Sequence, residues 1–209
     1  MSVWLVSLSA HADSGPSDAL LHELIVEHYG LKVIPWAGEG SEMMRSALQA
    51  MSIRFHRSAP EVDRMNEVGL QIEQMLMEAL DAQGAQVQRP RTRSGRGQSS
   101  GYPDLWMQWQ GQSFYVEVKT FSSHTLRSSQ RTFYFSVSED PKVTESAIHL
   151  LAGFEIEKRD DSHHRIVAYH LVDLRELPCK VKVEYNASNR ELYGNPQLGF
   201  QIHERVPFD

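Results

Sequence analysis

Residues 102–119 read YPDLWMQWQGQSFYVEVK, and they decide the fold. Apolar residues recur at alternate positions on both sides of the dipeptide Gln110-Gly111, as they do in strands with one buried face. A polar residue followed by glycine between two such runs is typical of a two-residue hairpin turn. The stretch therefore predicts two antiparallel strands, residues 102–109 and 112–121, joined by a tight turn.

The length of the turn decides which side chains face each other. With a two-residue turn, Asp104 lies directly opposite Glu117, and Lys119 projects from the same face because it is two residues further on. A three-residue loop would instead set Asp104 against Val118. The two-residue turn predicts an apolar core face made of Leu105, Met107, Trp109, Phe114, Val116 and Val118. The second face would carry Asp104, Trp106, Tyr115, Glu117 and Lys119.

This second face has the residue types of a metal-dependent phosphate chemistry. Two carboxylates that face each other across a strand pair repel unless something lies between them. Mg²⁺ favours carboxylate oxygens and retained waters, so Asp104 and Glu117 are candidate ligands. Such an ion could polarise a phosphate oxygen, while Lys119 would neutralise phosphate charge and orient the attacking water. The structural alternative is an ordinary Glu–Lys pair on a surface hairpin.

The net charge of the chain is unevenly distributed. The 209 residues carry −6 with a pI of about 5.9, which taken alone argues against a protein that coats nucleic acid. Residues 82–138, however, hold seven Lys or Arg and only two acids, a net charge of +5, so the rest carries −11. Those two acids are Asp104 and Glu117. The chain thus has a basic middle that surrounds the carboxylate pair.

Two polar segments supply most of this positive charge, one on each side of the hairpin. Residues 88–101 are rich in Arg, Ser and Gly, and we expect this loop to be flexible until it meets an anion. Arginine forks suit phosphates and guanine edges, so both segments are predicted to contact DNA; a solvated surface loop is the alternative. The candidate DNA-binding residues here are Arg89, Arg91, Arg93, Arg96, Ser122, Arg127, Gln130 and Arg131.

We expect one α/β domain over residues 1–209, because no repeat or long linker divides the chain. Within it we expect an N-terminal helical part at residues 1–60 and the catalytic core at residues 61–138. Residues 139–209 should supply the remaining sheet and a DNA-contacting C-terminal part. Expected helices cover residues 17–29 with a cap at Ser17-Asp18 and an end at Gly30, 41–51, and 60–83. Further strands are expected over 131–137, 150–158, 165–174 and 180–185, with 141–151 ambiguous between helix and strand.

The cysteine count and the short apolar runs predict a cytoplasmic protein without membrane contact. A single cysteine, Cys179, excludes internal disulfides and any multi-cysteine zinc site. The first residues, MSVWLVSLSAHA, have no positive region and too short an apolar run for a signal peptide. No apolar run has the length needed to cross a bilayer.

The hairpin resembles the PD-(D/E)xK nuclease superfamily, which has the restriction endonuclease-like fold. The motif stands here as Pro103-Asp104, twelve residues, and Glu117-Val118-Lys119. Members often place a helical Gly-x-x-x-Glu before the hairpin, and this chain has Gly69 and Glu73 in that place. The resemblance implies an αβββαβ core with a mixed central sheet flanked by helices. It also implies catalytic roles for Asp104, Glu117, Lys119 and Glu73, with Asp104, Glu117 and Val118 at the metal; a solvated helix glutamate is the alternative for Glu73.

Within that superfamily the chain looks most like a type II restriction endonuclease. Such enzymes are commonly single-domain homodimers that cut double-stranded DNA with Mg²⁺, for which Mn²⁺ can substitute, alongside a cognate DNA methyltransferase. The polar stretch that follows the last predicted strand adds Asn186, Asn189 and Arg190 as candidate DNA contacts, although such residues also form turns.

Other functions leave different traces in a sequence. A junction resolvase-like repair or recombination nuclease on the same fold is the nearest alternative, and a non-catalytic DNA-binding module is a further one. Binding alone does not need two facing carboxylates, which argues against the module. The chain has no phosphate-binding Walker loop, no dinucleotide fingerprint and no His-Glu-x-x-His zinc motif.

Overall fold

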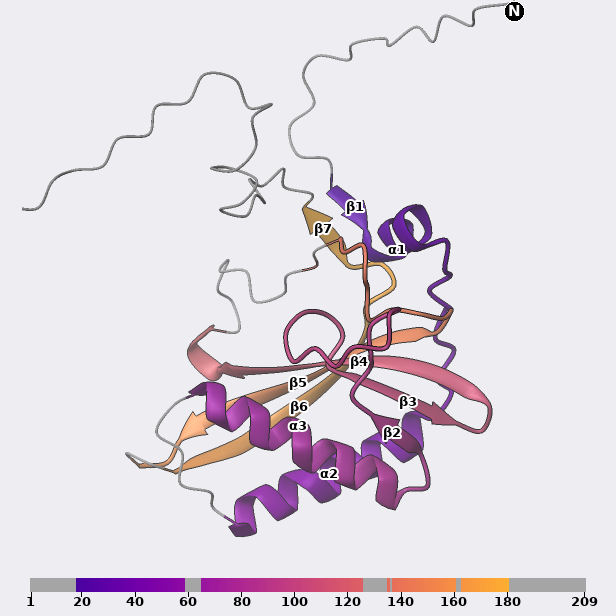
Figure 1. The fold of residues 1–209 in the computed structure, drawn as a ribbon. Coiled ribbons are helices and arrows are strands. Elements are labelled where there is room, and N and C mark those ends of the chain that lie inside the picture. Colours follow the sequence, from indigo (N-terminus) through magenta and orange to yellow (C-terminus); the bar gives the residue numbers. More distant parts are fainter. Residues whose placement is uncertain (1–17, 59–64, 126–134, 136, 161–162, 181–209) are drawn as a thin grey trace, which may run out of the picture. The chain divides into compact units, whose positions relative to one another are not determined.

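The computed structural model describes residues 18–58, 65–125, 135, 137–160 and 163–180. Residues 18–179 form one unit, and the second unit, 1–17 with 180–209, lies outside the described residues except for residue 180. The elements are β1 (Asp18–Leu20), α1 (Leu21–Tyr29), α2 (Ser41–Ser58), α3 (Met65–Ala82), β2 (Gln86–Gln88), β3 (Leu105–Trp109), β4 (Gln112–Ser122), the 3₁₀ helix η1 (Ser123–Thr125), β5 (Ile148–Lys158), β6 (His164–Asp173) and β7 (Pro178–Lys180) (Figure 1). The single domain over residues 1–209 stays a prediction.

The predicted hairpin is confirmed in its turn and its register. Gln110 and Gly111 have φ angles of 47° and 78°, and two successive positive φ values are those of a type I′ turn. Trp109 pairs with Gln112, and the ladder runs back to the pair formed by Leu105 and Val116. Asp104 immediately precedes this last pair and so lies level with Glu117, as the two-residue turn requires.

The hairpin forms the middle of a mixed sheet with strand order β2-β3-β4-β5-β6. β4 and β5 run parallel, whereas the other neighbours are antiparallel. The α3-β2-β3-β4 order agrees with the first part of the expected core, although β2 is a short strand that the sequence did not predict. A parallel pair needs a crossover, and residues 126–134 of that crossover lie outside the described residues. The helix expected before the last strand of the αβββαβ core therefore stays a prediction.

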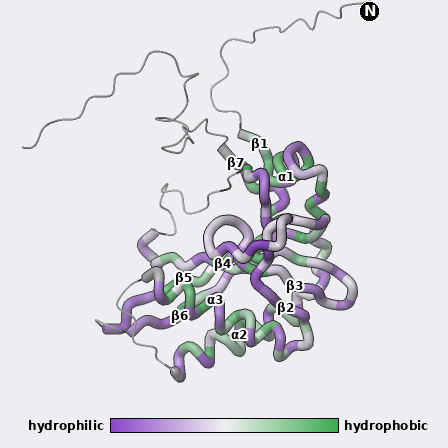
Figure 2. Tube along the Cα trace, in the orientation of Figure 1, coloured by the Kyte–Doolittle hydropathy of each residue, from purple (hydrophilic) through white to green (hydrophobic). Residues whose placement is uncertain are grey.

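Helices α2 and α3 cover one face of this sheet (Figure 1). Apolar residues at helical spacing make the contact, which Figure 2 shows as green turns alternating with purple ones. In α3 the buried positions include Ile72, Leu76 and Leu80. Helix α2 continues past its predicted end at residue 51, because Phe55 extends the same stripe and is fully buried.

A second apolar cluster covers the opposite face near the hairpin. It joins Leu21 and Ile25 of α1 with Tyr102 and Tyr115. Tyr115 lies on the second face of the hairpin, as predicted, but this face is covered there, since only 1% of Tyr115 is exposed. The hairpin is buried on both faces around its centre, and only part of its second face is left for charged groups.

The ends of the described elements agree with expectation at most places. Gly30 ends α1 with φ 68°, and its N–H donates to Val26 O at 3.0 Å. The predicted cap at Ser17-Asp18 is wrong, because α1 begins at Leu21 and the Leu20 N–H donates to Glu23 Oε2 at 2.8 Å.

The strands expected over 150–158 and 165–174 are confirmed by β5 and β6. Of the strand expected over 180–185, residues 181–185 lie outside the described residues, and residue 180 ends β7. The strand expected over 131–137 falls mostly outside the described residues, and Phe135 and Val137 belong to no strand. Among the described helices, none combines the length and apolar character that crossing a bilayer requires.

Candidate active site

Asp104 is held across the hairpin by the backbone of β4. Its Oδ2 accepts a hydrogen bond from the Val118 N–H at 2.8 Å. Because β3 begins at Leu105, the carboxylate takes the place of the next main-chain acceptor in the ladder. The side chain is thereby fixed level with Glu117 and remains partly exposed.

Glu117 is the buried carboxyl group of the pair. Only 5% of the residue is exposed, and its Oε1 accepts from Lys119 Nζ. Among the described residues, Oε2 has no hydrogen-bond partner although it is buried. Burial and then the charge of Asp104 raise the pKa of Glu117 to about 7, against the lowering effect of Lys119.

Lys119 connects this pair to solvent. It follows Glu117 by two residues on β4 and lies on the same side of the strand. About 32% of its side chain is exposed, compared with 6% for Glu117. Its ammonium group therefore sits where a solvent-borne anion can reach it.

Glu73 reaches the same group of charges from α3. Its residue exposure is 8%, and Oε1 lies 2.5 Å from Arg89 Nη1. Burial raises the pKa of Glu73, Arg89 lowers it and Asp104 raises it further. Of the other glutamates on this helix, Glu67 is exposed and Glu78 pairs with Arg54 at 2.5 Å. Among these three, Glu73 is the one that lies beside Asp104.

Lys142 is a member of the site that the sequence analysis missed. It is 5% exposed, and Nζ donates to Gly101 O at 2.7 Å and to Pro103 O at 3.1 Å. Burial lowers its pKa, and Asp104 is the first of the carboxylates that counter this effect. A single lysine in an irregular segment shows no periodicity, so no sequence signal pointed to it. We call Glu73, Asp104, Glu117, Lys119 and Lys142 the carboxylate cluster.

Tyr102 anchors the chain just before Asp104. Its hydroxyl lies 2.5 Å from Nδ1 of His149, and the two rings stack with centroids 5.8 Å apart. His149 is fully buried, and burial lowers its pKa to about 3, so the imidazole is neutral at physiological pH. Tyr102 and Lys142 together hold the segment that presents Asp104.

The carboxylate cluster fits a divalent cation. The buried Glu117 Oε2 has no hydrogen-bond partner among the described residues, and the raised pKa of Glu117 shows that its negative charge is poorly compensated. Mg²⁺ commonly binds through one or two carboxylates and keeps several waters, so Asp104 and Glu117 suit it, with the Val118 main chain beside them. Within the described residues, no three His, Cys, Asp or Glu side chains form a complete metal cage.

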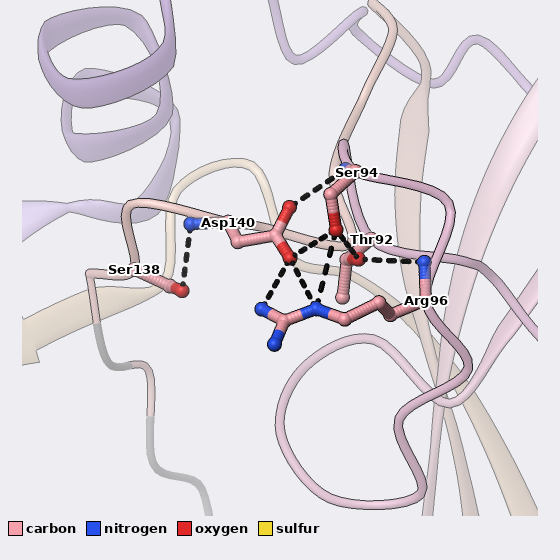
Figure 3. A network of polar contacts seen from close by, with 5 residues as sticks. All are labelled: Thr92, Ser94, Arg96, Ser138 and Asp140. Atoms are coloured by element: carbon pink, nitrogen blue, oxygen red, sulfur yellow. Dashed lines mark hydrogen bonds and ion pairs between the residues drawn. The ribbon is translucent and has the colours of Figure 1, made fainter.

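The basic loop, residues 89–101, contains a hydrogen-bonded turn, and its expected flexibility in the absence of an anion stays a prediction. The Thr92 N–H donates to Arg96 O at 2.9 Å, and Arg91 Nη1 donates to Gly95 O at 3.0 Å. Asp140 fastens the loop from another segment: its Oδ2 lies 2.6 Å from Arg96 Nη2, and its Oδ1 accepts from the Ser94 N–H at 2.7 Å (Figure 3). These bonds hold the pKa of Asp140 well below its usual range, first through Arg96 and then through Ser94.

The remaining candidate DNA contacts are dispersed. Ser122 ends β4, where its main-chain carbonyl accepts from Thr125 Oγ1 at 2.9 Å. Arg91 and Arg93 are exposed on the basic loop, whereas Arg89 and Arg96 are paired with Glu73 and Asp140. The predicted contacts that lie outside the described residues are Arg127, Gln130, Arg131, Asn186, Asn189 and Arg190.

Comparisons with known proteins give one family. A family model described as the type II restriction enzyme MjaV family matches residues 21–196. A curated relative, the type II restriction enzyme MjaV of Methanocaldococcus jannaschii, is 38% identical over 139 residues, which cover 62% of this chain. The match spans 60% of that relative's length. No solved structure matches significantly.

Proposed function

This chain belongs to the MjaV family of type II restriction enzymes, and from that premise we propose that it is a site-specific endonuclease that hydrolyses phosphodiester bonds of double-stranded DNA with Mg²⁺. The observation that carries the proposal is the facing pair Asp104 and Glu117 with Lys119 beside it. The buried, poorly compensated Glu117 carboxylate supports a cation at this place. The relative's name supports DNA as the substrate.

In this mechanism Asp104 and Glu117 would hold Mg²⁺, with Mn²⁺ able to substitute, and Val118 would be adjacent. The bound ion supplies Lewis-acid polarisation of the phosphate and a lowered pKa for a water. Lys119 exchanges its contact with Glu117 for the phosphate, neutralises its charge and orients the attacking water. Hydrolysis then follows in-line attack on the phosphodiester.

Glu73 and Lys142 act around this centre. Glu73 assists as a further metal ligand, or through a water, once Arg89 has left Glu73 to bind a DNA phosphate. Lys142 holds the Gly101 and Pro103 carbonyls and so keeps the Asp104 segment in place. Lys142 is a positioning residue, because it donates hydrogen bonds to main-chain carbonyls and not to the reacting groups.

The basic loop supplies DNA contacts in this proposal. Exposed arginines neutralise phosphates, and guanidinium forks can also read guanine edges. We assign phosphate or base contact to the arginines of the loop, and to Ser122, Arg127, Gln130, Arg131, Asn186, Asn189 and Arg190. Cutting both strands of a duplex needs two such sites, so the proposed active form is a homodimer, functioning with a cognate DNA methyltransferase.

Digestion of a mixed-sequence plasmid tests the proposal. Wild-type protein with Mg²⁺ should give discrete fragments whose sequenced ends share one motif. Asp104→Asn and Lys119→Ala should abolish cutting while the fold and DNA binding persist, and the exposed Lys32→Ala serves as the matched control. Wild-type-like cutting by either site variant would refute the assignment, and cutting confined to branched DNA would favour a junction resolvase.

A further inference from the structure

A hollow of about 460 Å³ is lined by residues of the basic loop and of the hairpin. Trp106 and Tyr115 line it, and they form the strand pair directly after Asp104 and Glu117 on the same face of the hairpin. Residues two apart on a strand are separated by about 6.6 Å, so the hollow begins beside the proposed scissile phosphate. None of the roles proposed above uses Trp106.

The walls of this hollow are held in place by hydrogen bonds. The Trp106 indole N–H donates to Glu145 Oε1, which fixes the ring and leaves Oε2 as an acceptor. On the same side, the Thr144 N–H donates to the Tyr115 hydroxyl at 2.9 Å. The hollow is thus formed before any ligand enters, as is usual for small-molecule pockets of this size.

The lining combines the groups that recognise a single nucleotide. Trp106 offers an aromatic ring, and every base can stack on such a surface. Glu145 offers a carboxylate, which accepts from the exocyclic amino group of a base. Arg93 also lines the hollow and is exposed, and among the described residues it pairs with no carboxylate, so its guanidinium is available to a phosphate.

The shape of the hollow selects among the ways of reading DNA. Bases inside a duplex present only their edges, and protruding side chains read those edges in a groove. A concave site with an aromatic wall is instead filled by a base that has left the stack. We propose that this hollow receives one base extruded from the recognised duplex, stacked on Trp106 and bound through its amino group by Glu145. This inference rests on the proposed function, because it names how that enzyme reads its substrate.

The test uses duplexes that carry a single mismatch at each position of the site found by plasmid sequencing. Extrusion is easiest for a base that is already unpaired, so a mismatch at the extruded position should strengthen binding by about tenfold. Elsewhere a mismatch should weaken binding, as it does for groove readers. Affinities are measured with full-length protein carrying Lys119→Ala, which prevents cutting.

Variants of the residues that line the hollow test whether the stronger binding of a mismatched duplex depends on the hollow. Trp106→Ala should remove the gain, and Trp106→Phe should restore most of it because the stacking ring remains. Glu145→Ala alters an exposed side chain with little risk to folding and should also reduce the gain, whereas the exposed Glu139→Ala should leave it intact. Weaker binding for mismatches at every position, or a gain that survives both Trp106→Ala and Glu145→Ala, overturns the proposal. Absence of any sequence-specific binding or cutting would instead refute the proposed function itself.

Discussion

The carboxylate cluster and the basic loop both concentrate charge, but they hold it in different ways. In the cluster, Glu73, Glu117 and Lys142 are each less than a tenth exposed, and burial shifts the pKa of all three away from its ordinary value. In the basic loop the arginine side chains reach solvent, and the one tied by Asp140 is still 73% exposed.

This difference suits the carboxylate cluster to catalytic chemistry and the basic loop to contact with DNA. Charges in a low-dielectric site interact strongly and tune one another, which suits acid–base and metal chemistry. Exposed charges interact weakly with their neighbours and remain available to a polyanion. Substitutions in the cluster should therefore change the rate and its pH dependence, whereas those in the loop should change affinity and its salt dependence.

The largest effect is expected for Glu117→Gln. Cleavage should fall on the order of 1,000-fold or more, because a neutral amide cannot replace a carboxylate ligand. In the absence of metal, the same substitution should increase the free energy of unfolding. The raised pKa of Glu117 means that its ionisation costs folding free energy, which accumulates as pH rises from about 4.5 to about 7.

Urea unfolding in EDTA measures this trade-off. At pH 8 the variant should be more stable than wild type by roughly 2–3 kcal/mol, and at pH 4.5 the difference should largely vanish because the folded wild type then carries a protonated Glu117. The Glu155→Gln variant on β5 provides the control. Lower stability of Glu117→Gln at pH 8 would mean that Glu117 is not destabilised by its site.

A smaller effect on rate is expected for Lys142→Met. Losing this buried charge removes a positive neighbour of Glu117, so the pKa of Glu117 should rise and the acid limb of the kcat/KM profile should move to higher pH. At pH 7.5 the value of kcat/KM should fall about 10–100-fold. The exposed Lys32→Met is the matched control.

The pH profile separates a charge effect from damage to the fold. A purely structural role for Lys142 would lower activity by the same factor at every pH. An unshifted acid limb in Lys142→Met would therefore contradict the electrostatic link between Lys142 and the carboxylates.

The smallest effects are expected in the basic loop, where free and tied arginines can be compared. Arg93→Ala should weaken DNA binding about 3–10-fold and reduce the slope of log K against log salt by about 1, as loss of one phosphate contact does. Arg96 and Asp140 are best removed together, as Arg96→Ala with Asp140→Asn, because the pair then leaves as a neutral unit. Binding titrations from 50 to 200 mM salt should show a near-wild-type slope for that double variant. Equal slopes for Arg93→Ala and wild type would contradict the distinction between an arginine that contacts DNA and one that is paired with Asp140.

The hairpin could be predicted from the sequence because local chemistry specifies it. The Gln110-Gly111 turn and the alternation of apolar residues determine its register, and that register brings Asp104 level with Glu117. The position of Glu73 also followed from helical spacing, since it borders the buried stripe of α3.

The contacts that were missed come from residues distant in sequence. Lys142 and Asp140 both belong to an irregular segment without periodicity, so nothing local links them to Pro103 or to the basic loop. The face that carries Tyr115 was predicted, but not the apolar cluster that covers it, because alternation along a strand cannot reveal a second layer. Each of these contacts is a product of tertiary packing.

If the proposed function holds, the hydrogen bonds of Lys142 also bear on when, during its synthesis, the chain becomes able to cut the DNA of the cell that makes it. A ribosome synthesises the whole hairpin, with Asp104, Glu117 and Lys119, before it adds the residue that steadies the Asp104 segment. β4 also acquires its parallel neighbour β5 only after that point. Nascent or truncated chains would therefore carry the reactive residues without their alignment, and competence to damage chromosomal DNA would arise late in synthesis.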